Sequence, residues 1–150
     1  MANLVVTPSL ADLDSLAALF DAYRVFYEQP SDKGVATAFV KQRLENGDSR
    51  FFAVKEDDGS LSGFVQLYPT FSSVSAGTAW VLNDLYVMPE QRRRGIAEDL
   101  MTAALAFAKE TGAVFVALET HHDNASAQNA YRKMGFVEQT GTRLFEFDLS

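Results

Sequence analysis

The chain has 150 residues, a net charge of −7 and no cysteine. This length favours one domain around one core. The lack of cysteine excludes disulfides, a cysteinyl acyl-enzyme and a Cys-ligated metal, and the negative charge disfavours nucleic acid as a partner. No apolar run approaches the ~18–20 residues that span a bilayer, and MANLVVTPSLAD lacks signal-peptide features. We therefore expect a cytoplasmic protein with no membrane partner.

The N-terminal part of the chain predicts one strand and two helices. Residues 4–9 predict the strand. Residues 11–27 repeat apolar side chains at helical spacing and predict the first helix. Residues 31–47 predict the second helix, with Ser31 as its N-cap and Gly47 as its stop.

The middle of the chain alternates strands and a helix. A β-hairpin is predicted by RFFAVKEDDGSLSGFVQLYP, with Asp58-Gly59 at its turn. A long strand follows at 79–89, and 96–112 has the apolar face of a strong helix. Residues 113–120, AVFVALET, form a continuous apolar run that predicts a buried strand.

The C-terminal part adds a short helix at 124–136 and an alternating last strand at 143–149. Runs of helix and strand in this order predict an α/β fold in which helices pack on a mixed sheet. We expect a single domain over residues 1–150.

Three consecutive arginines stand in VMPEQRRRGIAEDLM, between the predicted long strand and the following helix. The first amides of a helix lack internal partners, and the helix dipole adds positive potential at that end. Gly95 permits a tight turn and close backbone approach. A phosphate or pyrophosphate suits such a site, although a solvated basic cap with a turn glycine explains this stretch alone equally well.

Two motifs in order carry a family resemblance. Arg92-x-x-Gly95-x-Ala97 resembles the R/Q-x-x-G-x-G/A pyrophosphate loop of the GCN5-related N-acetyltransferases, the GNAT superfamily. The segment NASAQNAYRKMGF resembles the downstream element of that superfamily, and one predicted helix and one strand separate the two motifs. The residues of this segment at the family spacing are Asn124, Ala127, Tyr131, Gly135 and Phe136.

The resemblance implies a single GNAT domain with a mixed, mostly antiparallel sheet of six to seven strands, helices on both faces and a splayed central strand pair. It implies acetyl-CoA as co-substrate and no metal. The residues it places on the coenzyme are the strand Leu85, Tyr86 and Val87, the loop Arg92, Arg93, Arg94, Gly95, Ile96 and Ala97, and then Asn124 and Ala127.

Acetyl transfer to an alkyl amine needs a base, because an amine of pKa ~10.4 is almost fully protonated at pH 7. Asp84 is the candidate, since a carboxylate inside WVLNDLYV is costly unless it is paired or functional. A structural carboxylate that accepts from nearby amides is an equal alternative. The family places a tyrosine beside the sulfur, which makes Tyr131 the candidate acid for the leaving thiolate. Its alternative role is aromatic packing.

The acceptor is less defined. The stretch GFVQLYPTFSSVSAGTAWVLNDLYV resembles the spermidine/spermine acetyltransferase branch, which commonly carries two acidic residues where this chain has Asn83-Asp84. An acceptor with a carboxylate, such as an amino acid, would suit Arg24. The residues we expect around the acceptor are Arg24, Phe26, Tyr27, Tyr68, Phe71, Asn83 and Glu119.

We therefore expect an acetyl-CoA-dependent N-acetyltransferase that acts on a small cationic amine or an amino acid. The alternatives are an acetyltransferase of protein lysines or N-termini and a non-catalytic CoA-binding sensor. A narrow aromatic pocket around Tyr27, Tyr68 and Phe71 would favour a small acceptor. His121-His122 lacks metal-ligand spacing and predicts a solvated pair. We also expect that such a protein can form a homodimer.

Overall fold

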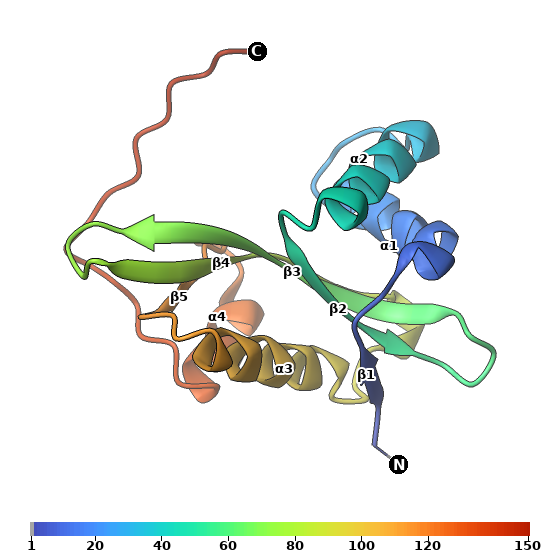
Figure 1. Ribbon diagram of the computed structural model, residues 1–150. Coiled ribbons are helices and arrows are strands. Elements are labelled where there is room, and N and C mark those ends of the chain that lie inside the picture. Colours follow the sequence, from blue (N-terminus) through green and yellow to red (C-terminus); the bar gives the residue numbers. More distant parts are fainter. Residues whose placement is uncertain (1) are drawn as a thin grey trace. The chain divides into compact units, whose positions relative to one another are not determined.

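The protein forms two compact units, seen here in a computed structural model that describes residues 2–150. One unit extends to Glu119, and the other comprises Thr120–Ser150. In chain order the elements are β1 Leu4–Val6, η1 Leu10–Asp12, α1 Leu13–Phe26, α2 Lys33–Asn46, β2 Arg50–Lys55, β3 Leu61–Ser72, β4 Gly77–Val87, η2 Pro89–Gln91, α3 Ile96–Glu110, β5 Val116–Ala117 and α4 Ala125–Lys133 (Figure 1).

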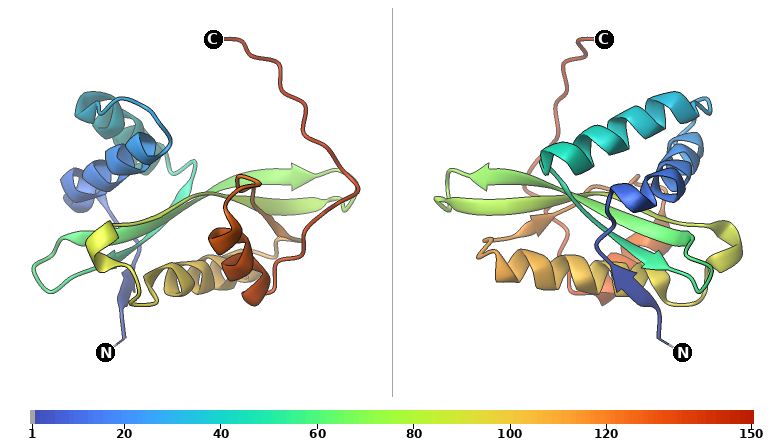
Figure 2. Two further views of the ribbon diagram at one scale, coloured as in Figure 1. Left: turned by 180° about the vertical axis from the view of Figure 1, so that it is seen from behind. Right: turned by 45° about the vertical axis from the view of Figure 1, so that its right-hand side comes forward.

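The first unit is a five-stranded sheet in the order β1-β2-β3-β4-β5. The first three strand pairs are antiparallel, and the β4–β5 pair is parallel. Helices α1 and α2 cover one face, and α3 covers the other (Figures 1 and 2). This confirms a mixed, mostly antiparallel sheet between helices, but the six to seven strands that we expected were too many. None of the described helices is long and apolar enough to cross a membrane.

Aromatic rings fill the core between the sheet and the α1–α2 pair. The Phe20 ring stacks on Phe39 at 5.1 Å and meets Phe64 of β3 at 6.3 Å. Leu16 and Val40 are fully buried beside them. Burial of one large apolar side chain contributes about 1.5–3 kcal/mol, so this layer fixes both helices on the sheet.

Helix α3 begins very close to the opposite face of the sheet, and Gly63 of β3 makes this approach possible. A Cβ atom at position 63 would lie 3.0 Å from Cγ2 of Ile96 and 3.1 Å from the Tyr86 carbonyl oxygen. Ile96 is itself buried, and it is the first residue of α3. The absence of a side chain at Gly63 therefore sets where the arginine loop meets the helix.

A β-bulge interrupts the β3–β4 ladder. Gln66 pairs with Asp84, whereas the next residue, Leu67, pairs with Leu82, so Asn83 is the extra residue. Such a bulge reverses the alternation of side chains along the strand. Upstream, Trp80 packs on Phe107 of α3, and downstream the Tyr86 ring lies 6.5 Å from Tyr23 of α1. The bulge therefore turns Asp84 toward the α1 face.

Two predicted strands differ from the structure. The buried strand expected at 113–120 is only β5, which pairs with Trp80 and Val81 of β4. Val114 and Phe115 are about half exposed, because the two-residue ladder covers little of this run. The strand expected at 143–149 does not form, since an alternating pattern needs a backbone partner to become a strand. Its Leu144, Phe145, Phe147 and Leu149 are 65–89% exposed.

The N-cap of α2 also corrects the sequence reading. Asp32, not Ser31, is the cap, and its Oδ1 accepts the Val35 amide at 3.0 Å. Ser31 instead donates to Oδ2 of the buried Asp21 at 2.6 Å, and the Asp32 amide donates to Oδ1 of Asp21 at 2.8 Å. The first turn of α2 is therefore held by the Asp32 cap and by two hydrogen bonds to Asp21 of α1. Gly47 ends α2 at φ +62, as expected.

Replacement of the cap tests this assignment. We expect Asp32→Ala to lower the free energy of unfolding by about 1 kcal/mol, because the first turn of α2 loses a side-chain acceptor. Asp32→Asn is the matched control and should keep most of the stability, since asparagine caps equally well. Urea denaturation of the two variants and the wild type measures the difference. Equal losses in both variants would contradict the cap.

Candidate active site

Asp84 lies on β4 with only 1% of its surface exposed. Its Oδ2 accepts a hydrogen bond from Nε2 of Gln66, and its Oδ1 accepts from Nδ2 of Asn83 at 2.7 Å. The Tyr23 hydroxyl donates to the Asn83 carbonyl at 3.3 Å and lies close enough to Asp84 to interact with it. These residues and the nearby Tyr68 are called the Asp84 cluster below.

Burial governs the ionisation of this cluster. It raises the pKa of the Asp84 carboxyl, although hydrogen bonds from Asn83, Gln66 and Tyr23 act in the opposite direction. Burial, and then the Asp84 charge, raise the pKa of Tyr68 to about 12 and raise that of Tyr23 further. Both phenols are therefore neutral at pH 7, while burial raises the pKa of the Asp84 carboxyl.

The segment after Asp84 has one open edge. Leu85, Tyr86 and Val87 pair with β3 on one side. On the other side the β4–β5 ladder covers only Trp80 and Val81, so within residues 2–150 this stretch has no strand partner there. The divergence agrees with the splayed pair that the resemblance implies. An unpaired strand edge offers backbone groups that can pair with an extended ligand.

The arginine loop turns twice through the left-handed region. Arg93 has φ +70, and Gly95 has φ +74 at the N-cap of α3. A left-handed turn points successive amides into a concavity that suits an anion. Apart from the residues adjacent in the chain, no atom of residues 2–150 lies within 4 Å of the place that a Cβ at Gly95 would take, so the space above the loop is open. Because the Ile96 side chain is buried, only its backbone faces this space.

The three arginines have different surroundings. Nε of Arg92 donates to the Val87 carbonyl at 3.0 Å, and its guanidinium lies 5.7 Å from the Tyr86 ring centre. Arg94 forms an ion pair with Glu56 at 2.9 Å. Arg93 is exposed. Arg92 and Arg94 therefore brace the loop against β4 and the β2–β3 turn, which sequence reasoning did not anticipate.

The structure brings only some of the expected acceptor residues together. Tyr27 packs on Tyr23 at 4.9 Å and on Phe26 at 5.3 Å, so this end of α1 is an aromatic group beside the Asp84 cluster. Phe71 is 82% exposed near the β3–β4 turn. Glu119 is also exposed. Neither Phe71 nor Glu119 is part of the Asp84 cluster.

Arg24 belongs to the junction of α1 and α2. Hydrogen bonds from Ser31 and from the Asp32 backbone lower the pKa of Asp21, and the charges of Lys33 and Arg24 act in the same direction. The side chain of Arg24 thus has a nearby carboxylate within the protein. It is half-buried, which leaves it a weaker candidate for an acceptor carboxylate than the sequence implied.

A cavity of about 420 Å³ lies beside Tyr68. Its lining residues are Phe39, Arg43, Asp48 and Tyr68. Arg43 forms an ion pair with Asp48 at 2.7 Å and lies 4.9 Å from the Phe39 ring centre. Tyr68 is the only member of the expected aromatic trio in this lining, so the cavity is half polar rather than a narrow aromatic pocket.

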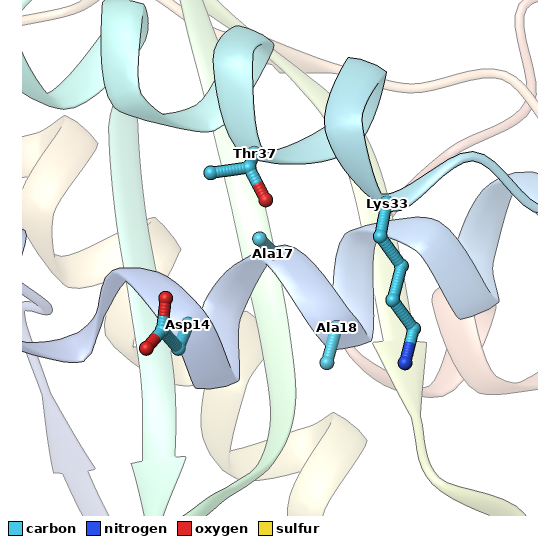
Figure 3. A pocket seen from close by; sticks show the side chains of 5 residues that line it. All are labelled: Asp14, Ala17, Ala18, Lys33 and Thr37. Atoms are coloured by element: carbon cyan, nitrogen blue, oxygen red, sulfur yellow. The ribbon is translucent and has the colours of Figure 1, made fainter.

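A second hollow, of about 270 Å³, lies between α1 and α2 (Figure 3). Ala17 and Thr37 face each other across the two helices, and Asp14 and Lys33 lie toward opposite ends. Ala18 completes the lining, which shares no residue with the Asp84 cluster. This hollow reflects small side chains where the helices meet.

The second unit holds the other motif. Asn124 caps α4, and its Oδ1 accepts the Ala127 amide at 3.2 Å. The half-buried Tyr131 lies on α4 with its ring 6.0 Å from Phe136. Ahead of the helix, ligand atoms of His121, His122 and Asp123 all lie within 4.8 Å of one another, but the three side chains are exposed and pair among themselves. They do not form a built metal site.

The acetyltransferase (GNAT) family model matches residues 16–136. The chain belongs to the GNAT family. YhfO of Bacillus subtilis (strain 168), described as an uncharacterized N-acetyltransferase, is 44% identical over 131 residues, 87% of each chain. A probable acetyltransferase of Haemophilus influenzae is 30% identical over 142 residues, 93% of each.

A solved structure supports the same assignment. The crystal structure of a probable acetyltransferase superposes with a TM-score of 0.92 and 38% identity, over 98% of both chains. The protein is an acetyl-CoA-dependent N-acetyltransferase. Its GNAT fold has a curled mixed sheet of five strands.

Sequence reasoning missed one member of the Asp84 cluster of this GNAT protein, Gln66, which is fully buried on β3. A signal for Gln66 was present, because a glutamine inside GFVQLYP is as unusual in a buried strand as the aspartate in WVLNDLYV. Tyr23 stands in the YRVFY segment that we expected to shape the acceptor cleft, but its contact with Asn83 spans 60 positions and was not predicted.

The raised pKa of Asp84 predicts how stability changes with pH. A carboxyl that binds its proton more tightly in the folded state than in the unfolded chain, where its pKa is ~3.9, lowers the free energy of unfolding as pH rises between the two values. Asp84→Asn lacks this loss. We therefore expect the melting temperature of Asp84→Asn, relative to the wild type, to rise from pH 4 upward and then level off. A constant or falling difference would show that the pKa is not raised.

Proposed function

We propose that the protein transfers an acetyl group from acetyl-CoA directly to a primary amine of a small molecule, with Asp84 as the general base and Tyr131 as the general acid. One observation carries this proposal. A carboxylate that is 99% buried and has a raised pKa stands immediately before the strand segment with an open edge, Leu85–Val87. A buried charge is costly, so its place beside this open edge favours a functional role.

The chemistry assigns each proton. The amine nitrogen forms a bond to the acetyl carbon as the carbon–sulfur bond breaks. The proton of the amine passes to Asp84, directly or through water, and a carboxylate with a raised pKa is a stronger acceptor at neutral pH. Each Asp84 oxygen accepts one amide hydrogen bond, and the Tyr23 hydroxyl takes at most one of the two remaining lone pairs, so one stays for this proton. The leaving thiolate, with a pKa of about 8.5, takes its proton from Tyr131.

The arginine loop is the proposed site of the coenzyme pyrophosphate. The open space above Gly95 and the left-handed turns at Arg93 and Gly95 support backbone contact with an anion. The edge of Leu85–Val87 is the proposed partner of the pantetheine arm. Asn124 and Ala127 stay proposed coenzyme contacts, on the strength of the family motif.

A small-molecule acceptor is supported by the relatives and by the cluster. Streptothricin, an aminoglycoside and L-ornithine are the substrates named for three curated relatives, which match over 59–62% of this chain. Asp84 is a single carboxylate whose neighbour is Asn83, so the paired acids of the polyamine branch are missing. We therefore favour an amino acid or an aminoglycoside as acceptor over a polyamine. Acetylation of protein lysines is the alternative.

A panel of amines tests the proposal. Purified protein is mixed with acetyl-CoA and polyamines, amino acids, aminoglycosides or a lysine peptide, and release of the thiol is followed. We expect turnover with at least one small amine and its loss in Asp84→Asn. Turnover on the peptide alone would contradict the acceptor class. Coenzyme binding without turnover on any amine would favour a sensor.

Gly95→Val tests the loop. Valine is strained at φ +74, and its side chain would fill the open space above the loop, so we expect no binding of coenzyme A in calorimetric titration. Gly59→Val is the matched control, because Gly59 has φ +86 at the β2–β3 turn and equally open surroundings. Both variants should lose about 1–3 kcal/mol of stability to strain. Normal binding by Gly95→Val would reject the pyrophosphate site.

Tyr131→Phe tests the proposed acid. The ring and its contact with Phe136 remain, so coenzyme binding should survive and the melting temperature should change little. The turnover number should fall by about 10²–10³-fold, the contribution expected of a general acid. Steady-state kinetics at saturating amine and acetyl-CoA decide the matter. A turnover number within about threefold of the wild type would assign Tyr131 to packing instead.

Two expectations about context stay predictions, a cytoplasmic location and a homodimer. The exposed apolar side chains of residues 143–149 support self-association. An extended segment with this alternation lowers its free energy when its backbone pairs and its apolar face is covered, and a second copy of the chain is the partner we favour.

A further inference from the structure

Gln66 is the one fully buried amide side chain in the described part of the chain, and both of its ends are hydrogen-bonded. Its Nε2 donates to Oδ2 of Asp84, while its Oε1 accepts from Oγ of Ser49 at 2.7 Å. A buried glutamine without partners destabilises a core, so its place here requires these contacts. Ser49 lies half-buried just before β2, and the three residues form a chain that leads inward to the carboxylate.

The two ends of this amide are not interchangeable. An ionised carboxylate only accepts hydrogen bonds, so the amide must present its nitrogen to Asp84. Its oxygen then faces Ser49, whose hydroxyl supplies the matching donor. The carboxylate itself opposes the flipped orientation, in which the amide oxygen would face the Asp84 oxygens, and Ser49 holds the amide oxygen in its present place. The pair Ser49–Gln66 is thus suited to hold Asp84 in its ionised form.

We propose that Gln66 is a positioning residue for the acetyl transfer, and that Ser49 fixes its amide so that it steadies the Asp84 carboxylate as a proton acceptor. This rests on the proposed role of Asp84 as the base. Gln66 acts through Asp84 and need not touch the substrate. Asn83 donates to the other carboxylate oxygen, so the two amides together fix the plane of the group.

The groups that face Asp84 do not titrate near neutral pH, so the pH profile can report the ionisation of Asp84. They are Tyr23 of α1, Tyr68 and Gln66 of β3, and Asn83 of β4. Arg43 of α2 acts on Tyr68 from beyond the cluster. The pKa of Tyr68 is about 12 and that of Tyr23 is raised further, so neither phenol titrates near neutral pH. A change in the acid limb of the pH profile can therefore be assigned to Asp84.

The test compares Gln66→Met, Ser49→Ala and Ser15→Ala. Methionine fills the space without donating to Asp84, so the acid limb of kcat/KM should move upward by about one pH unit or more. Ser49→Ala should move it in the same direction by less. Ser15→Ala is the matched control, since it removes another half-buried hydroxyl, one that accepts the Leu61 amide, and should leave the limb unchanged. Coenzyme affinity should be normal in all three.

If the acid limb of kcat/KM is the same as in the wild type in both Gln66→Met and Ser49→Ala, the proposal is overturned and Gln66 is a packing residue. If Gln66→Met does not fold, Ser49→Ala carries the test alone. Carboxyl NMR titration of Asp84 in each variant gives a readout that does not need activity. An upward shift there, combined with full activity of Asp84→Asn, would support the contact and reject Asp84 as the base, so the two proposals fail separately.

Discussion

The buried charge of Asp84 is the constraint on which the proposed site depends. A carboxylate removed from water needs donors, and this one has amides from Gln66 and Asn83 with the Tyr23 hydroxyl nearby. These donors come from both central strands and from α1. The same contacts that make the charge tolerable therefore tie a helix to the sheet, and they leave a carboxylate whose pKa is still raised by burial.

The rest of the first unit places two further features next to that charge. Gly63 lets α3 start against the sheet. The arginine loop that precedes this helix is thereby held beside the end of β4, where Arg92 donates to the Val87 carbonyl. The two-residue ladder between β4 and β5 leaves the intervening strand edge open. The proposed base, an open strand edge and the proposed pyrophosphate loop thus follow one another along a single stretch of chain, and this continuity suits the proposed direct acetyl transfer.

The sequence could predict what depends on local pattern. Helical spacing located α1 and α3, cap and stop residues located α2, and the two motifs located the loop and α4. Contacts between residues far apart in the sequence could not be predicted. Ser31 hydrogen-bonds Asp21 of α1 instead of capping α2, Gln66 reaches Asp84 across the β3–β4 pair, and Tyr23 reaches Asn83 from α1. Residues 113–120 and 143–149 have the pattern of strands, but only Val116–Ala117 form one. A strand pattern does not supply the partner strand that it needs.

The bulge at Asn83 has a consequence for insertions and deletions. Leu82 and Asp84 already pair with the adjacent residues Leu67 and Gln66, so a chain that lacked residue 83 would keep an unbroken ladder with every apolar side chain on its present face. Such a deletion would leave the apolar core in place. It would remove one of the two amides from which Asp84 accepts and the carbonyl that Tyr23 reaches, while Asp84 and Gln66 would remain. One codon thus separates a buried carboxylate with two amide donors from one with a single donor.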